Sequence, residues 1–361
     1  MRNKFLVSMG IICAALCLFI LTVFASGADE ETEESSSSAP SWVDSLYSTP
    51  KPTADPEATA DPNATAAPDS TADPDATETP EPTATPKPTA TPSEYMQQGA
   101  LVQAGTPEAE KIKVPVLLYH HISDDFDDTN AISIISPSDF RLHMTAIKTQ
   151  YTPISLREYV EFVNCEDGSK YIPNNPIIVT FDDGYSSNYE IAFPILKELN
   201  IPATIFVVTD TVGAQAGEGK VNYSHFTWEQ AKEMQDSGLI EIQSHTNDHV
   251  KLGPLGRDER AYELRKSKYL IEKNLGTVCD MFAYPYGSYD DESIELARQA
   301  GYNVQILVGD NTTELDYEVN LVSEGVESIK RMTISGVMGN VNVIETIRRA
   351  CANKVIPDSG D

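Results

Sequence analysis

The sequence Ile-Ile-Val-Thr-Phe-Asp-Asp-Gly at residues 177–184 constrains the fold of this chain more than any other stretch. Its apolar and β-branched residues follow Pro176 and are typical of a buried strand. Such a strand would deliver Asp182 and Asp183 to its carboxyl end, where α/β folds place their chemistry. Because neighbouring side chains of a strand point to opposite faces, each carboxylate must have its own environment. A cation beside the pair would hold one Asp as a ligand and keep the other ionised as a base. The alternative is an ordinary Asp-Asp-Gly turn.

A pair of histidines follows a second strand-like run, residues 239–243. His245 and His249 are four residues apart and would meet on one side of a helical turn, a spacing suited to zinc-like metals. Two unrelated surface histidines are the alternative, although the chain has only six His in total. One carboxylate and two imidazoles would complete a three-ligand site with a position left open for water.

Three motifs occur in a characteristic order: Thr-Phe-Asp-Asp-Gly at 180–184, His-Thr-x-x-His at 245–249, and Phe-Ala-Tyr-Pro-Tyr-Gly at 282–287. Together they resemble the ordered motifs of the polysaccharide deacetylases, the NodB-homology family or carbohydrate esterase family 4. The resemblance covers roughly residues 111–350. It implies an α/β fold, an irregular (β/α) barrel of about seven parallel strands.

The resemblance also implies roles for individual residues. Asp183, His245 and His249 would bind one divalent metal ion. Zinc is the expected ion, with cobalt or nickel as alternatives. Asp182 would be the general base that takes a proton from the attacking water.

The third motif implies a substrate contact. Backbone N–H groups near Tyr286 and Pro285 would help to hold the oxyanion of the reaction. Thr246 is expected to brace the histidine loop rather than to touch substrate.

Two departures from the family pattern affect the mechanism. Ala283 stands where many members have an Arg that orients the base, so that contact is expected to be missing. The C-terminal His that supplies the general acid in many members is also absent, since no His follows His249. Residues 116–121, Val-Leu-Leu-Tyr-His-His, resemble the first strand of the poly-N-acetylglucosamine deacetylase branch, where a His at this strand end is the acid. This resemblance assigns His120 as the acid and leaves His121 as the fallback. The other interpretation of His120 is a hydrogen-bonded core histidine.

The N-terminal sequence has the pattern of an export signal. Arg2 and Lys4 precede an apolar run over residues 5–25 that is long enough to span a membrane. Small residues at 26–28 could suit a signal peptidase, so residues 1–28 are either a cleaved signal peptide or a retained signal anchor. The protein is therefore expected outside the cytoplasmic membrane, anchored at the cell surface or secreted.

Residues 29–110 have the composition of a disordered linker. They are rich in Pro, Thr, Ala and Ser, and carry 17 acidic residues against two lysines. Too few apolar groups are present to offset the entropy of ordering, and self-repulsion favours an extended chain. Such a segment could hold a domain away from a membrane, or it could be an inert spacer.

Residues 111–361 are expected to form the catalytic domain. Strand-like runs alternate with helix patterns, which indicates a parallel sheet or barrel. The segment carries 22 basic and 38 acidic residues, which argues against nucleic acid as a partner. Cys165, Cys279 and Cys351 leave room for at most one disulfide. We expect a monomer.

The leading hypothesis is an extracytoplasmic, metal-dependent hydrolase that removes N-acetyl groups from an N-acetylglucosamine-containing polysaccharide of the cell wall or a biofilm. One alternative is an O-acetyl esterase on xylan-type polysaccharide. Another is a catalytically weak wall protein that binds glycan.

Overall fold

The computed structural model describes residues 101–125, 133–216, 223–308, 318–334 and 343–356. The expected N-terminal apolar segment and most of the expected linker lie outside these residues.

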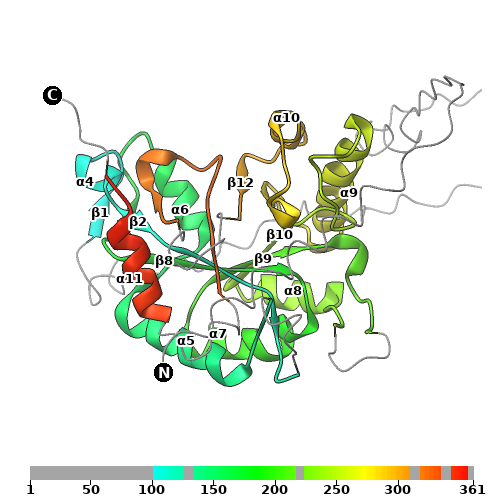
Figure 1. Cartoon of the computed structure of the whole chain (residues 1–361), viewed down its shortest axis with the longest axis horizontal. Helices are drawn as coiled ribbons and strands as arrows, with labels where there is room; N and C mark the ends of the chain where they lie inside the picture. The colour runs from blue at the N-terminus through cyan, green and yellow to red at the C-terminus, as the bar shows by residue number, and fades with distance from the viewer. Residues whose placement is uncertain (1–100, 126–132, 217–222, 309–317, 335–342, 357–361) are drawn as a thin grey trace, which may run out of the picture. The chain divides into compact units, whose positions relative to one another are not determined.

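A curved parallel sheet forms the centre of the domain (Figure 1). Its strands, in spatial order, are β12 (Val304–Ile306), β11 (Met281–Ala283), β10 (Ile240–Ser244), β9 (Ala203–Val207), β8 (Pro176–Asp183), β3 (Val116–Tyr119) and β14 (Met332–Thr333), and the short β6 (Thr152–Pro153) also pairs with β8. Every pairing within this sheet is parallel. The prediction of about seven parallel strands is confirmed.

The two edges of the sheet meet next to β14. Ile306 of β12 forms a parallel bridge with Ile329, which precedes β14 in the chain. The Leu307 N–H donates to the Ile329 carbonyl at 2.7 Å, and the Ile329 N–H donates to Gln305 at 3.1 Å. The barrel is thus irregular, because its edges are joined by a short segment rather than by a full strand.

Helices follow most of the strands and pack around the sheet (Figure 1). They are α5 (Pro137–Gln150), α6 (Leu156–Val163), α7 (Phe193–Leu199), α8 (Trp228–Asp236), α9 (Arg257–Leu275), α10 (Asp291–Gln299) and α11 (Val343–Asn353). Helices α6 and α8 each begin with a capping box, formed by Ser155 with Glu158 and by Thr227 with Gln230. In each, the side chains of the first and third positions satisfy backbone N–H groups that the helix leaves unpaired.

The helical segment that follows β8, residues 188–199, is formed in two parts. A π-helical turn, η1 (Asn188–Ala192), leads into α7, and Pro194 stands in the first turn of α7. A proline is tolerated there because its missing N–H would have no partner within the helix.

The folded region begins before the predicted boundary at Lys111. Strand β1 (Leu101–Gln103) pairs with β7 (Tyr171–Pro173), and α4 (Pro107–Glu110) follows it. The composition of residues 29–110 as a whole places residues 101–110 in the expected linker. Ala104 and Ala109 are nonetheless buried against the domain, and this tertiary packing outweighs the local composition.

Pro115 interrupts the extended segment that leads to His120. Residues 114–119 form β2 (Lys113–Val114) and β3, separated at Pro115. Strand β2 pairs with β13 (Asn320–Leu321) outside the main sheet, and β4 (His121–Ile122) pairs with β5 (Ile134–Ile135).

The alternation of side chains along β8 decides which way its carboxylates point. Ile177, Val179 and Phe181 belong to the larger apolar core, which includes the buried faces of α5, α7 and α8. Ile178 belongs to the second core, which includes residues of β3, β11 and β12. Asp182 is therefore on the same side as Ile178, facing the inside of the barrel.

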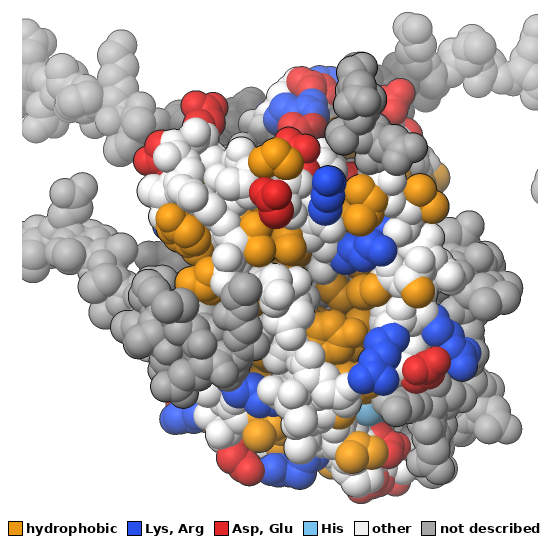
Figure 2. All heavy atoms as spheres, turned by 90° about the vertical axis from the view of Figure 1, so that its left-hand side faces the viewer, with side chains coloured by type: hydrophobic (Ala, Val, Ile, Leu, Met, Phe, Trp, Pro, Cys, Tyr) orange, Lys and Arg blue, Asp and Glu red, His pale blue; other side chains and the backbone are white. Residues whose placement is uncertain are grey.

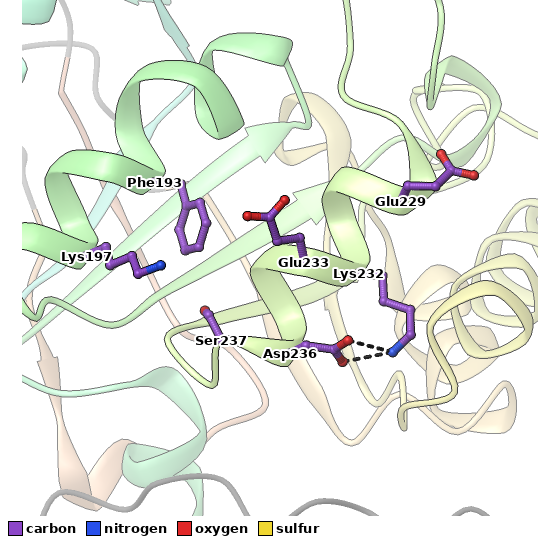
Figure 3. A pocket seen from close by; sticks show the side chains of 7 residues that line it. All are labelled: Phe193, Lys197, Glu229, Lys232, Glu233, Asp236 and Ser237. Atoms are coloured by element: carbon purple, nitrogen blue, oxygen red, sulfur yellow. Dashed lines mark hydrogen bonds and ion pairs between the residues drawn. The ribbon is translucent and has the colours of Figure 1, made fainter.

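The outer surface is mixed in character. On the face drawn in Figure 2, acidic, basic and apolar side chains are interspersed. A groove between α7 and α8 is lined mostly by charged side chains, and Lys232 and Asp236 form an ion pair there (Figure 3). None of the motif residues lines this groove.

Two further observations concern covalent links and membranes. Cys165, Cys279 and Cys351 are all free thiols, so the one disulfide that the sequence left open is not formed among them. Within the described ranges, no helix has both the length and the apolar character needed to cross a membrane.

Candidate active site

Asp182 is buried at the carboxyl end of β8 and pairs with Arg331. The guanidinium donates to both carboxylate oxygens, at 2.6 and 2.7 Å, and both side chains are almost fully buried. Burial alone would raise the pKa of Asp182. The charge and hydrogen bonds of Arg331, together with nearby imidazoles, lower it instead to about 2. The carboxylate is thus ionised and fixed in orientation at neutral pH.

Arg331 corrects the expectation that the base has no arginine partner. Ala283 is indeed buried without a charge, but an arginine from the residue just before β14 performs the contact. Arg331 also donates from Nε to the Leu307 carbonyl at 3.2 Å, and its guanidinium lies 5.5 Å from the centre of the Phe206 ring. The sequence offered only a weak signal for it, since Lys330 and Arg331 are simply two adjacent cations before a short apolar run.

Asp183, His245 and His249 come together beside this pair. The Asp183 Oδ1 atom lies 3.6 Å from His245 Nε2 and 3.3 Å from His249 Nε2. One ligand atom from each of the three residues lies within 4.8 Å of the others. The three residues that the sequence proposed as ligands are therefore neighbours in the structure.

The hydrogen bonds of this cluster indicate which of its nitrogen and oxygen atoms could bind a metal ion. His245 Nδ1 lies 2.8 Å from the Ala283 carbonyl. A carbonyl only accepts, so Nδ1 carries the proton. Burial lowers the pKa of His245 although the Asp182 and Asp183 charges oppose this effect, which favours the neutral ring. A neutral ring that is protonated at Nδ1 presents a lone pair at Nε2. Asp183 Oδ1 is buried and has no hydrogen-bond partner among the described residues.

A cation fits this arrangement. With its proton on Nδ1, His245 presents an acceptor at Nε2 only 3.6 Å from Asp183 Oδ1, and two acceptors this close repel each other unless a cation joins them. Zinc bonds of about 2.0–2.2 Å at tetrahedral angles place ligand atoms about 3.4 Å apart. The carbonyl bond to His245 Nδ1 is also the usual second contact of a metal-binding imidazole. The donor set therefore fits a zinc-like divalent ion.

The histidine pair lies in a loop rather than on the helical turn that the four-residue spacing suggested. Thr246 and His249 both have left-handed backbone conformations, with φ of 67° and 55°. The Thr246 hydroxyl accepts from the His249 N–H at 3.0 Å, which confirms that Thr246 braces the loop. The imidazole rings end with their centres 5.1 Å apart.

The turn after β8 is equally constrained. Asp183 has a φ of 71° and Gly184 a φ of 81°. A Cβ added at Gly184 would lie 3.2 Å from Val207 and 3.3 Å from Phe226. Glycine is needed here both for its backbone conformation and for space. The left-handed Asp183 turns its carboxylate toward the histidines while Asp182 points into the barrel.

His120 lies at the end of β3 and close enough to Asp182 to lower the pKa of that carboxyl. Its Nδ1 atom is buried without a hydrogen-bond partner in the described part of the chain. The interpretation as a hydrogen-bonded core histidine therefore has no support at this nitrogen.

His121 is held differently from His120. It is buried, and its Nδ1 lies 2.9 Å from the Ser187 hydroxyl. Burial and the nearby His225 lower its pKa to about 4.

Sequence reasoning missed two further residues at this site. His225, placed only in a loop before a helix, stacks on Tyr185 with ring centres 5.0 Å apart. Burial lowers the pKa of His225 while the Asp183 charge opposes this effect, so His225 lies near the cluster. Burial and Asp183 both raise the pKa of Tyr185. The adjacency of Tyr185 to the Asp-Asp-Gly motif was the available signal, whereas His225 had none.

The third motif lies beside His249. Pro285 is buried in a short 3-10 turn, η3 (Pro285–Gly287), and Tyr286 within it has a φ of 58°. The Tyr286 ring contacts His249 with a centroid distance of 4.6 Å, and 63% of the residue is exposed. The predicted oxyanion segment is thus adjacent to the candidate metal ligands.

Comparisons with known proteins agree with this geometry. Residues 170–305 match the family model for polysaccharide deacetylase. YxkH of Bacillus subtilis (strain 168) is 29% identical over 224 residues, which cover 62% of this chain and 72% of YxkH. A poly-beta-1,6-N-acetyl-D-glucosamine N-deacetylase of Staphylococcus aureus (strain MRSA252) is 30% identical over 176 residues. That match covers 46% of this chain and only 58% of the staphylococcal enzyme.

Solved structures share the fold. The Streptococcus pyogenes deacetylase PplD, solved with acetate, has a TM-score of 0.53 and 26% identity, covering 65% of this chain and 98% of that one. IcaB from Ammonifex degensii has a TM-score of 0.54 and 26% identity, covering 66% and 97%. With its three ordered motifs, its parallel irregular barrel and these matches, the domain is similar to the polysaccharide deacetylases in sequence and in fold.

Proposed function

We propose that this protein is an extracytoplasmic, metal-dependent N-deacetylase of an N-acetylglucosamine-containing polysaccharide. The observation that carries the proposal is the cluster of Asp183, His245 and His249, in which three possible ligand atoms lie within 4.8 Å of one another and Asp183 Oδ1 has no hydrogen-bond partner among the described residues. The name of the staphylococcal relatives supports the N-acetylglucosamine part of the proposal.

The chain's own groups can perform the proton transfers of amide hydrolysis. A divalent ion held by the three ligands would polarise the acetyl carbonyl and acidify a water molecule. Asp182 lies 3.6 Å from His245 and is held ionised by Arg331, which suits a base that accepts a proton from the attacking water. Backbone N–H groups around Tyr286 would help to stabilise the developing oxyanion.

His120 is the proposed proton donor to the leaving amine. An amine leaves poorly unless it is protonated, so the reaction needs an acid in addition to the base. His120 is near Asp182 and has a free ring nitrogen. Both His120 and Arg331 lie outside residues 170–305, the region that matches the family model.

Two other functions use the same fold. An O-acetyl esterase would need the same metal site but a weaker acid, because an alkoxide leaves more easily than an amine. A glycan-binding protein without activity would not require a buried, ionised Asp182 beside His245. The site geometry favours catalysis, and substrate assays separate the two enzymes.

The first test measures acetate release by the purified full-length protein. We expect release from poly-N-acetylglucosamine or chitooligomers, loss of activity in chelator and recovery with zinc or cobalt. Peptidoglycan and acetylxylan are assayed in parallel. His249→Ala should fail to retain metal because it removes one of three ligands. Full activity in the metal-free protein would contradict the proposal, and activity on acetylxylan alone would favour the esterase.

The second test separates the roles of the two carboxylates. Asp182→Asn should keep the metal bound and lose most turnover, about 10²–10⁴-fold, because it removes a base and not a ligand. Metal content by atomic absorption and acetate release are measured on the same sample. If the substitution emptied the metal site, Asp182 would have to be counted among the ligands.

The third test concerns His120. His120→Ala should retain metal and reduce amide hydrolysis strongly, while hydrolysis of an activated aryl acetate changes much less, since that leaving group hardly needs a proton. His143→Ala is the control, because His143 lies on α5, contacts the Tyr119 hydroxyl of β3 at 3.3 Å and is not part of the Asp183, His245 and His249 cluster. Equal losses on both substrates would instead indicate a structural or binding role for His120.

The location outside the cytoplasmic membrane rests on the N-terminal sequence. We expect the protein in the membrane fraction or the culture medium, because residues 5–25 are apolar enough for export. Fractionation with an antibody to the domain decides this, and N-terminal sequencing of the product distinguishes a retained anchor from cleavage. Recovery in the cytoplasmic fraction alone would refute the proposed location.

A further inference from the structure

The loop that carries both histidines is fastened to helix α9 by one buried carboxylate. Glu263 Oε2 accepts hydrogen bonds from the Asn247 and Asp248 N–H groups, each at 2.9 Å. Glu263 is only 5% exposed. These two N–H groups lie between His245 and His249, so the carboxylate holds the centre of the segment that links the two imidazoles.

The loop has the shape of an anion-binding turn. Left-handed residues, Thr246 and His249, stand on either side of the two bonded residues. Such a backbone lets successive N–H groups converge on one acceptor. Glu263 supplies that acceptor from within the chain, and without it two N–H groups at a buried position would lack their partner.

The other hydrogen bonds of this loop do not involve the two N–H groups that Glu263 accepts. On the β9 side, the Asp210 N–H donates to the Asn247 carbonyl at 3.0 Å and the Thr209 hydroxyl donates to Asn247 Oδ1 at 2.9 Å. These bonds satisfy a carbonyl and a side chain. Within the described part of the chain, the Asn247 and Asp248 N–H groups both donate to Glu263.

Helix α9 is firmly placed to act as a support. Ser267, one turn after Glu263, lies with its hydroxyl 2.7 Å from that of Ser244, the last residue of β10. Arg260, one turn before Glu263, is buried and donates to the carbonyls of Gly253 and Leu255 at 2.7 Å. The helix therefore contacts the chain before, within and after the histidine segment.

We propose that Glu263 is a positioning residue that sets the spacing of His245 and His249 through its two hydrogen bonds to the loop between them. This inference rests on the proposed function insofar as the two histidines are metal ligands. It assigns Glu263 no contact with substrate or metal. Its effect should appear first in metal affinity and coordination geometry.

The role can be separated from a simple effect of negative charge. Glu263→Gln keeps a carbonyl oxygen at the same reach but removes the charge. Glu263→Asp keeps the charge but withdraws the oxygens by one methylene. Burial and the neighbouring Asp248 and Asp210 carboxylates raise the pKa of Glu263 to about 7, so a neutral amide is compatible with these surroundings.

The experiment titrates Co²⁺ into metal-free full-length protein and follows the visible absorption bands, which report coordination geometry. Zn²⁺ competition gives the affinity for zinc. We expect Glu263→Ala and Glu263→Asp to weaken metal binding by about 10–100-fold and to alter the bands, as loss of an outer contact of a metal site does. Glu263→Gln should lose less than about 10-fold, because charged hydrogen bonds are roughly twice as strong as neutral ones.

A matched control lies on the same helix. Arg257→Ala removes an exposed ion pair to Glu292 and should bind Co²⁺ like the wild type. Thermal unfolding of each metal-free variant shows whether it folds. If Glu263→Ala does not fold, the comparison of the other two variants tests the proposal: Glu263→Gln should bind metal more tightly than Glu263→Asp.

Each outcome has a defined meaning. Wild-type binding in all three Glu263 variants, or a strong loss in Gln with none in Asp, overturns the positioning role while leaving the proposed function intact. A wild-type protein that binds no metal and releases no acetate overturns the proposed function, and the inference with it.

Discussion

The buried ion pair between Asp182 and Arg331 is the interaction on which the rest of the site depends. It joins the centre of the sheet at β8 to its edge at β14, across β3, and both side chains are buried. Removing one partner of such a pair leaves an uncompensated buried charge and typically costs about 3–5 kcal/mol. The pair thus serves two purposes. It places the two-residue strand β14, and it holds the carboxylate of Asp182 ionised and fixed beside His245.

Strained backbone is concentrated around the same point. Among the described residues, five that are not glycine have positive φ, and four of them are Asp183, Thr246, His249 and Tyr286. Asp and His adopt this conformation more readily than most residues, but a β-branched Thr rarely does. Each such residue costs on the order of 1–3 kcal/mol and persists only where its surroundings determine it. Here the surroundings are named contacts: Thr246 with the His249 N–H, and Glu263 with the loop centre.

The sequence predicted the parts of this molecule that local patterns encode. Apolar runs and capping residues gave the strands and helices of the barrel, and the motifs gave the proposed ligands Asp183, His245 and His249, which the fold does bring together. Arg331 could not be foreseen, because it lies 149 residues from Asp182 and no spacing rule connects them. His225 reaches the site through a bridge to Tyr185 that only tertiary structure creates. Residues 101–110 were misassigned because pairing with β7, rather than their own composition, folds them.

The different environments of two adjacent carboxylates explain how one short motif could provide two functions. Asp182 continues the alternation of β8 into the barrel, where Arg331 occupies both of its oxygens. An oxygen that already accepts charged hydrogen bonds is a poor metal ligand, but a carboxylate kept ionised and oriented can accept a proton. Asp183 breaks the alternation with its left-handed backbone, and its Oδ1 is buried with no hydrogen bond within the described structure. An unpaired anionic oxygen between two imidazoles is costly unless a cation joins it. The proposed division between base and ligand therefore follows from the position of Arg331 and the turn at Gly184, and exchanging the two roles would require both to change.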